Sequence, residues 1–253
     1  MSLITLTTDF GVRDWFVGAM KGVILSVNPQ AVVVDITHEI PPGDIRAGAF
    51  ALAESCRCFP SNSVHVAVVD HGVGSQRAAI VVRTSDYYFV GPDNGILSLA
   101  LAKEKVLEIW QVENEIYFHQ PVSNTFHGRD IFALVAAHLT HRVLMDSLGP
   151  PLKDYVKLDW PKPQVVDGFL RGEIVYIDHF GNAISNIESP EKRAGTVRVP
   201  DKVQCDLKKF YQEVPDGHPL AIPGSTGYLE IAVNGGNAAQ TFSLKLGDPV
   251  ELA

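Results

Sequence analysis

The sequence contains little cysteine, no long apolar run and none of several common ligand-binding or nucleophile motifs, and each absence excludes a class of protein. The three cysteines form no zinc or redox spacing, and their odd number is atypical of a disulfide framework, so we expect a reducing, cytoplasmic compartment. No apolar run approaches ~18 residues and the N-terminus enters a strand pattern at once, so neither a membrane span nor a signal peptide is expected. G-x-G-x-x-G, Walker A and G-x-S-x-G motifs are absent.

Positive charge is also scarce. The 21 basic residues are outnumbered by 29 acidic residues, the net charge is −8, and no basic stripe occurs, so a nucleic-acid partner is not expected. His138 and His141 share one face of a predicted helix, but no glutamate lies beside them at a metal-ligand spacing. We therefore expect neither a catalytic metal nor another cofactor.

The sequence does contain a regular alternation of strand and helix patterns over residues 1–148. This alternation predicts an α/β domain with a doubly wound, mostly parallel sheet and helices on both of its faces. The expected strands cover residues 3–8, 32–36, 64–69, 79–83, 87–90 and 106–110, and the expected helices cover 15–27, 45–55, 96–102 and 129–140. Asp14 is the candidate N-terminal cap of the first helix, and Asn28-Pro29 is expected to end it.

The character of the chain then changes. Residues 149–164 contain four prolines and are expected to form a linker. Residues 165–253 show short strand patterns at 170–176, 196–199, 229–233 and 249–252, with glycines between them and no strong helical periodicity. This pattern predicts a second domain, a small antiparallel β-barrel or sandwich.

Charged side chains lie beside three of the apolar segments in the first domain. Asp70 and Arg77 follow the strand at 64–69, Asp9 follows the first strand, and His127 precedes the last helix. Ligands of open α/β sheets bind beyond the carboxyl ends of the strands, so these residues are candidates for one composite site. Arg77 stays protonated and can hold a water or hydroxide, which His127 can also bond, while Asp70 can orient Arg77 or accept a proton. A salt bridge that merely fixes the turn is the alternative, with equal weight.

Further candidates have equally plain structural alternatives. Asp9 can accept hydrogen bonds from a ribose diol, or form a local Asx turn. The segment IDHFGN, with Asp178, Phe180 and Asn182, can recognise an amino group and stack on a base, or form a β-turn. The segment 224–239 can bind adenine edges and an α-amino acid, or form two hairpin ends; its candidate side chains are those of Ser225, Glu230, Asn234 and Asn237.

Seven segments occur in a fixed order along the chain: TTDFG, DITHEIPPGDI, VVDHGVGSQR, FVGPDNG, FHGRD, IDHFGN and GYLEIAVNGGNAA. As an ordered set they resemble the S-adenosyl-L-methionine (SAM) hydroxide adenosyltransferase family, the adenosine-forming SAM hydrolases, which are related to the fluorinase and chlorinase. The resemblance covers nearly the whole chain. It implies an N-terminal α/β domain, a C-terminal β-barrel and a homotrimer with active sites between neighbouring subunits. It also implies that an activated water attacks the ribose 5′ carbon of SAM and releases adenosine and L-methionine.

The resemblance also assigns roles to residues. The water-activating residues of the family fall on Asp70, Arg77 and His127, and its ribose-binding aspartate falls on Asp9. Its methionine contacts fall on Asp14, Asp178 and Ser225, and its adenine contacts fall on Phe180, Asn182, Asn234, Asn237 and Ala238. One departure is visible, because His71 stands where the family commonly has proline, and this places a titratable group beside the site.

Three other functions are weighed against hydrolysis. The halogenating relatives carry a tyrosine at the position of Asp70 and a longer insertion where only residues 84–88 separate two strands here, and both differences favour water over halide. A SAM or adenosine sensor without turnover is the second alternative. An unrelated phosphatase-like or metal-dependent hydrolase that uses the strand-end aspartates is the third.

Overall fold

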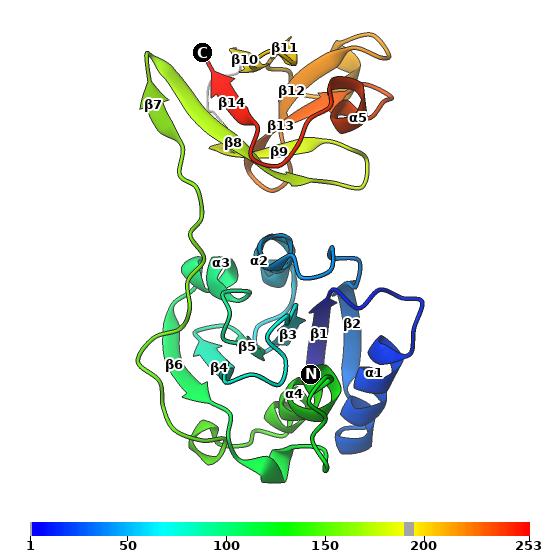
Figure 1. The fold of residues 1–253 in the computed structure, drawn as a ribbon, viewed down its shortest axis with the longest axis vertical. Coiled ribbons are helices and arrows are strands. Elements are labelled where there is room, and N and C mark those ends of the chain that lie inside the picture. Colours follow the sequence, from blue (N-terminus) through cyan, green and yellow to red (C-terminus); the bar gives the residue numbers. More distant parts are fainter. Residues whose placement is uncertain (1, 190–194) are drawn as a thin grey trace. The chain divides into compact units, whose positions relative to one another are not determined.

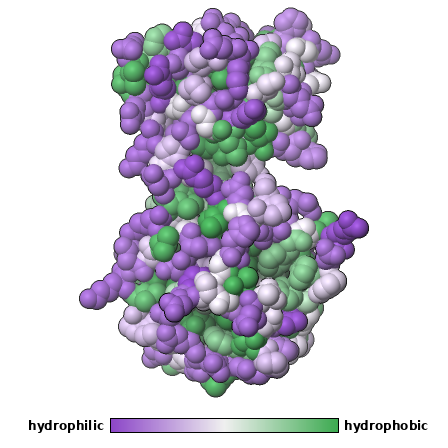
Figure 2. Space-filling view, in the orientation of Figure 1, coloured by the Kyte–Doolittle hydropathy of each residue, from purple (hydrophilic) through white to green (hydrophobic). Residues whose placement is uncertain are grey.

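The computed structural model describes residues 2–189 and 195–253. The chain divides into two compact units, of which the first ends at Leu158 and the second spans Asp159–Ala253, so the division falls within the proline-rich segment 149–164. Within the described residues, no helix combines the length and the apolar character needed to span a membrane. Figure 2 shows hydrophilic side chains over most of the visible face of each unit, with apolar patches between them.

The first unit is built on a six-stranded sheet of order β2-β1-β3-β5-β4-β6 (Figure 1). Its strands are β1 (Leu3–Thr8), β2 (Val32–Thr37), β3 (Val64–Val68), β4 (Ala79–Thr84), β5 (Tyr88–Pro92) and β6 (Val106–Gln111). The pairs β1–β2, β1–β3 and β3–β5 are parallel, whereas β4 runs antiparallel to both β5 and β6. The prediction of a mostly parallel sheet is confirmed.

Helices cover both faces of this sheet, as predicted. They are α1 (Phe16–Val27), α2 (Ile45–Ser55), α3 (Ser98–Ala102) and α4 (Leu134–Thr140), together with a π-helix over Gly128–Ala133. Helices α1 and α4 share a core with one face of β1 and β3, to which Ile4, Leu6 and Met20 contribute. Helices α2 and α3 pack on each other, and α2 also contacts β1, β2 and β3.

Two helix predictions need correction. Asp14 does not cap α1, because Trp15 occupies the N-cap position and no side chain caps the helix, which leaves Asp14 one residue too early to reach the first free N–H groups. The helix expected over 129–140 is a π-helix followed by α4. Asn28 ends α1 as expected, and its side chain also donates to Thr140 Oγ1 at 2.8 Å, which ties the ends of α1 and α4 together.

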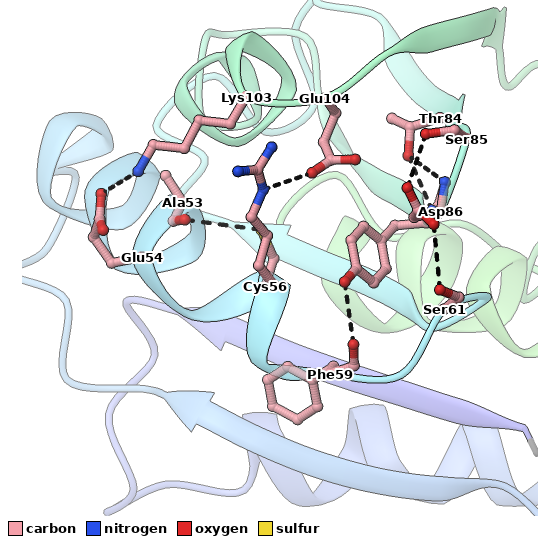
Figure 3. Close-up of polar contacts among 12 residues, drawn as sticks. Ala53, Glu54, Cys56, Phe59, Ser61, Thr84, Ser85, Asp86, Lys103 and Glu104 are labelled. Carbon is pink, nitrogen blue, oxygen red and sulfur yellow. Dashed lines mark hydrogen bonds and ion pairs between the residues drawn. The ribbon is translucent and has the colours of Figure 1, made fainter. Parts of the chain in front are cut away.

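Ion pairs join the C-terminal ends of α2 and α3 at the surface. Lys103 Nζ lies 2.6 Å from Glu54 Oε1, and Arg57 Nε lies 2.9 Å from Glu104 Oε1 (Figure 3). Beneath them, the Tyr87 hydroxyl donates to the Phe59 carbonyl at 3.1 Å. The basic side chains reach solvent, whereas those of Glu104 and Glu54 are only 5% and 15% exposed, so each pair compensates a largely buried carboxylate and fixes the geometry of the two helix ends.

The second unit is an antiparallel, nearly closed barrel of order β11-β10-β14-β8-β9-β13-β12, with β7 paired to β8. Its elements are β7 (Gln164–Val166), β8 (Phe169–Ile177), β9 (Ala183–Glu188), β10 (Thr196–Val199), β11 (Val203–Asp206), β12 (Pro219–Pro223), β13 (Tyr228–Val233), β14 (Pro249–Leu252) and the short helix α5 (Ala238–Phe242). A bridge between Leu207 and Ala221 brings the two outer strands of this order together. The predicted barrel is confirmed.

Candidate active site

β1 is the point in the sheet from which successive connections of the chain lead to opposite sides. The chain passes from β1 to β2 on one side and then to β3 on the other side of β1. The crevice at such a reversal, beyond the carboxyl ends of the strands, is where open α/β sheets bind ligands. Asp9 directly follows β1 and Asp70 lies two residues after β3, so both carboxylates lie at this point.

Asp70 and Arg77 form a bidentate ion pair across the turn that joins them. Arg77 Nε donates to Asp70 Oδ1 at 2.9 Å and to Oδ2 at 3.0 Å, and Arg77 Nη2 also donates to Oδ2. The side chains are only 4% and 11% exposed, respectively. Because both carboxylate oxygens accept from Arg77, the geometry favours the orienting role of Asp70 over that of a free base.

His127 completes a chain of three residues. Arg77 Nη2 lies 2.7 Å from His127 Nδ1. A guanidinium can only donate, so Nδ1 must accept, and neutral His127 therefore carries its proton on Nε2. The Arg77 guanidinium also lies over the ring of Phe132, 5.2 Å from its centroid, so one face of the cation is covered by an aromatic ring.

A close approach of two loops brings His127 to Arg77. Gly74 has φ +77°, and a Cβ at this position would lie 2.5 Å from the Asn124 carbonyl oxygen, so only glycine fits there. The loop that carries Asn124 is fixed in turn by Asp130, a fully buried carboxylate that accepts from Arg129 Nε at 2.6 Å and from the Ser123 amide at 2.8 Å. Asp130 was not selected from the sequence, although it directly follows the His-Gly-Arg segment.

The electrostatics of the site keep His127 neutral. Burial and the positive charge of Arg77 lower the pKa of His127, and they outweigh the opposite effects of Asp70 and Asp130. Arg77 Nη1 has no protein partner within the described part of the chain, and the same holds for His127 Nε2. The site therefore presents N–H donors from two side chains, which is suited to holding the oxygen of a water or hydroxide.

Asp9 is held from the loop that follows β2. Its Oδ2 accepts from the Gly43 amide at 2.8 Å, so the carboxylate bonds a distant segment instead of forming an Asx turn with its own neighbours. The ring of His71 lies against Gly43, where a Cβ would come within 2.3 Å of it. His71 is therefore packed onto the turn that anchors Asp9. Asp14 is exposed in the adjoining loop, beside the exposed Trp15.

In the second unit, the IDHFGN segment forms a tight turn. Asp178 Oδ1 accepts from the Asn182 amide at 2.8 Å, and Oδ2 accepts from Asn182 Nδ2 at 3.0 Å. Phe180, at the tip, is 71% exposed, which leaves its ring available for stacking. Asn182 Nδ2 also donates to the Tyr211 hydroxyl at 3.3 Å, and Tyr211 is a neighbour that sequence analysis missed. The turn and the candidate recognition site are thus compatible.

Glu230 is a buried carboxyl group, 7% exposed, on β13. A Cβ on Gly224 would lie 1.8 Å from Glu230 Oε1, so the glycine makes room for the carboxyl group. Burial and then the charge of Asp178 raise the pKa of Glu230, and burial, Glu230 and Asp178 raise that of Tyr211. Two neighbouring carboxyl groups with this electrostatic coupling favour a cationic ligand group.

The remaining candidates of this unit lie in structural positions. Asn234 Nδ2 donates to the Val214 carbonyl at 2.8 Å, and Asn237 caps α5 by accepting from the Gln240 amide at 2.8 Å. Ala238 is fully buried, whereas Ser225 is exposed. One polar atom of each amide is therefore bonded within the barrel, Nδ2 of Asn234 and Oδ1 of Asn237.

The described residues contain no group of three or more metal-ligating side chains. A cavity of about 810 Å³ opens in the first unit, but its lining includes Ser2, Val64 and Tyr88, which lie at the opposite ends of the strands from Asp9 and Asp70. On the wall of this cavity, the opposite charges of Arg83 and Glu108 compensate each other in an ion pair. This cavity is separate from the candidate active site.

Family models describe both parts of the chain. Residues 4–149 match the SAM hydroxide adenosyltransferase N-terminal domain, and residues 172–251 match the C-terminal domain of the same family. The chain belongs to the SAM hydroxide adenosyltransferase family. The resemblance inferred from the seven sequence segments is thereby confirmed.

Several known enzymes are similar to this chain over nearly their whole length. A (R)-S-adenosyl-L-methionine hydrolase of Salinispora tropica is 39% identical over 97% of this chain and 95% of its own. The enzyme of the same name from Methanocaldococcus jannaschii is 37% identical over 100% of this chain and 96% of its own. A fluorinase of Actinoplanes is more distant, at 25% identity over 97% of this chain and 95% of its own.

Two solved structures share the fold of this chain. An uncharacterized conserved protein from Thermotoga maritima superposes with a TM-score of 0.92 at 40% identity, covering 99% of both chains. A conserved hypothetical protein from Thermus thermophilus superposes with a TM-score of 0.83 at 34% identity over all of both chains.

Proposed function

We propose that the protein hydrolyses SAM to adenosine and L-methionine by attack of a water or hydroxide at the ribose 5′ carbon. The hydrogen-bonded chain Asp70–Arg77–His127 at the reversal point of the sheet carries this proposal. It agrees with the names of the relatives at 36% to 39% identity, which are (R)-S-adenosyl-L-methionine hydrolases. We propose the same R configuration at sulfur for the substrate of this chain.

The mechanism requires little acid catalysis, because the sulfonium of SAM is already an activated leaving group. Arg77 Nη1 and His127 Nε2 donate to the attacking oxygen and orient it, while Asp70 fixes the guanidinium plane. The positive charge of Arg77 lowers the pKa of a bound water and so favours hydroxide. Orientation alone can contribute roughly 7–11 kcal/mol to such a displacement. No cofactor takes part, since SAM is the substrate.

The substrate contacts follow the chemistry of the remaining candidates. Asp9 is proposed to accept hydrogen bonds from the ribose hydroxyls with the oxygen that Gly43 does not bond. The carboxylates of Asp14 and Asp178, with Ser225, are proposed to hold the methionine part, where Glu230 adds negative charge. The adenine is proposed to contact Phe180, Asn182 and residues 234–238, which include Asn234, Asn237 and Ala238.

We also propose a homotrimer with active sites between neighbouring subunits, and a cytoplasmic location. The family resemblance supports the trimer, and the three free cysteines, of which Cys56 and Cys205 are buried, agree with a reducing compartment. Analytical ultracentrifugation tests the trimer directly. A single species of monomer mass at micromolar concentration would contradict it.

The deciding experiment is incubation with each sulfonium epimer of SAM in ¹⁸O-water, with and without chloride or fluoride, followed by mass analysis of the nucleoside. Adenosine labelled at the 5′ oxygen is expected from the R epimer in every salt. A 5′-halogenated nucleoside would assign the chain to the halogenase chemistry. SAM that binds but is recovered unchanged would make the protein a sensor.

A further inference from the structure

Beyond the three proposed catalytic residues, a second histidine is tied to the site through the strand that carries Asp9. His38 follows β2 and is 3% exposed, and its Nδ1 lies 2.8 Å from Oγ1 of Thr8, the last residue of β1. A register shift between β1 and β2 aligns Thr7 with Thr37, so the next residues, Thr8 and His38, become neighbours. Neither residue was singled out from the sequence.

The His38 ring lies between the Thr8 hydroxyl and the Asp35 carboxylate. Its Nε2 lies 3.1 Å from Asp35 Oδ1, and Lys21 Nζ lies 2.6 Å from Asp35 Oδ2. Burial acts to raise the pKa of Asp35, but the bonds from Lys21 and His38 outweigh it, so the carboxylate stays ionised. In the tautomer that carries its proton on Nε2, facing the Asp35 carboxylate, Nδ1 accepts from the Thr8 hydroxyl.

His38 and Thr8 also hold the backbone that follows Asp9, at Phe10 and Gly11. Thr8 Oγ1 accepts from the Phe10 amide at 3.2 Å, and the Gly11 amide donates to the His38 carbonyl at 2.7 Å. Thr8 and Gly11 are thus bonded directly to His38, and Phe10 is bonded to it through the Thr8 hydroxyl. Asp9 itself is bonded to Gly43, five residues after His38.

We propose that His38, acting through Thr8, is a positioning residue that holds the Asp9 carboxylate in the orientation that recognises the ribose hydroxyls of the substrate. This inference rests on the proposed function, because it assigns Asp9 to the ribose. His38 itself touches no substrate. Its contribution appears as selectivity for ribose hydroxyls, which a purely structural role would not change.

The chain offers a matched control. Thr5, on the same strand and fully buried, bonds a buried histidine in the same way, with Oγ1 2.7 Å from His65 Nδ1. Thr8→Val and Thr5→Val therefore each remove one hydroxyl from a buried Thr–His bond of β1. Thr8→Ser restores the hydroxyl at the test position.

The test compares the dissociation constants of adenosine and 2′,3′-dideoxyadenosine for each variant, with the kcat and KM of SAM. Wild type, Thr5→Val and Thr8→Ser are expected to bind adenosine about 10-fold or more tightly than 2′,3′-dideoxyadenosine. This factor corresponds to the contribution of a hydrogen bond to a charged group. Thr8→Val is expected to lose most of this preference. Equal preferences in Thr8→Val and Thr5→Val would overturn the proposal.

Two substitutions of His38 separate the contact of Nδ1 with Thr8 from the contact of Nε2 with Asp35. His38→Asn can place a side-chain acceptor near the position of Nδ1, and His38→Gln can place an amide N–H near the position of Nε2. If the bond to Thr8 is what matters, His38→Asn keeps the ribose preference and His38→Gln loses it. The reverse order would overturn the assignment to Thr8.

Amide hydrogen exchange separates this inference from the proposed function, because it needs no ligand. Peptides that contain Phe10 and Gly11 are expected to exchange at least ~10-fold faster in Thr8→Val than in Thr5→Val, since the Phe10 amide loses its acceptor. Equal exchange would overturn the positioning role. A wild type that binds neither adenosine nor SAM would defeat the proposed function, and the exchange comparison would then decide the role of His38 alone.

Discussion

Arg77 donates from one nitrogen, Nη2, both to Asp70 Oδ2 and, at 2.7 Å, to His127 Nδ1. The two acceptors lie on segments that are 50 residues or more apart in the sequence, and the guanidinium is the group that joins them. Its plane is fixed by the carboxylate on one side, and it fixes the tautomer of the imidazole on the other. The orientation of both proposed donors therefore depends on Arg77.

Arg77→Lys is expected to lower kcat by about 100-fold or more while the dissociation constant of SAM changes little, because an ammonium cannot serve both neighbours in one plane. Steady-state kinetics and calorimetric SAM binding measure the two effects. Arg83→Lys is the matched control, since Arg83 also forms an Arg–carboxylate pair, with Glu108, at the opposite end of the strands. A loss of affinity with kcat intact would contradict the assigned role.

The rate is expected to fall in acid as His127 becomes protonated. Burial and Arg77 lower the pKa of His127 below its usual value of 6.5, so the neutral form persists below that pH. Protonation would place an N–H on Nδ1 against the Arg77 donor. The acid limb of kcat should therefore have its midpoint below pH 6.5, and His127→Gln should be slow and lack this limb. A midpoint above 6.5 would show that another group controls the rate.

The stability of the first unit is expected to fall in acid because of His65. This side chain is fully buried among the rings of Phe59, Tyr87 and Phe89, and burial lowers its pKa from 6.5 to about 4. The unfolded chain binds the proton first as the pH falls below 6.5, so stability is lost between about pH 6.5 and 4, by roughly 3 kcal/mol in total.

Urea unfolding at several pH values measures this loss. The double variant Thr5→Val/His65→Phe removes both partners of the buried hydrogen bond and leaves an apolar pair, which avoids an unsatisfied group. Its unfolding free energy should depend less on pH between 6.5 and 4 than that of wild type. Identical pH slopes would mean that other groups cause the acid sensitivity.

Glu230→Gln is expected to weaken SAM binding by about 10-fold or more and adenosine binding much less, because only SAM carries cationic groups. Burial and Asp178 raise the pKa of Glu230 in the free protein, and a bound cation opposes this effect. SAM binding to wild type should therefore release protons on the acid side of neutrality. Calorimetry in buffers of different ionisation enthalpy measures the release, and an unchanged release in Glu230→Gln would exclude Glu230 as its source.

Local patterns predicted most of the first unit. The strand expected over 3–8 is β1, residue for residue, because its run of apolar and β-branched residues ends at Asp9, where the turn begins. In the second unit β9 was missed, since Ser185 and Asn186 interrupt its apolar pattern. Both are buried, and they bond the Leu229 carbonyl and the Glu173 amide, so the strand is stable only inside the assembled barrel. Its stability depends on distant partners that no local pattern contains.

The candidate site was predicted in part as well. The strand-end positions and the family resemblance selected Asp70, Arg77 and His127, and the structure places the three in one hydrogen-bonded chain. The roles of His38 and Thr8 were not predicted. Their contact depends on a register shift between two strands, and a single sequence does not reveal such a shift.

The sequence by itself determined the alternation of strands and helices, the change to a barrel after the proline-rich segment, and the kinds of charged group at the strand ends. These follow from local periodicity and turn chemistry, which act over a few residues. The tertiary structure alone decided the strand order that brings Asp9 and Asp70 to one crevice, the tautomer of His127 and the burial of Glu230. Each of these depends on contacts between segments far apart in the chain, where packing and hydrogen bonding decide which groups meet.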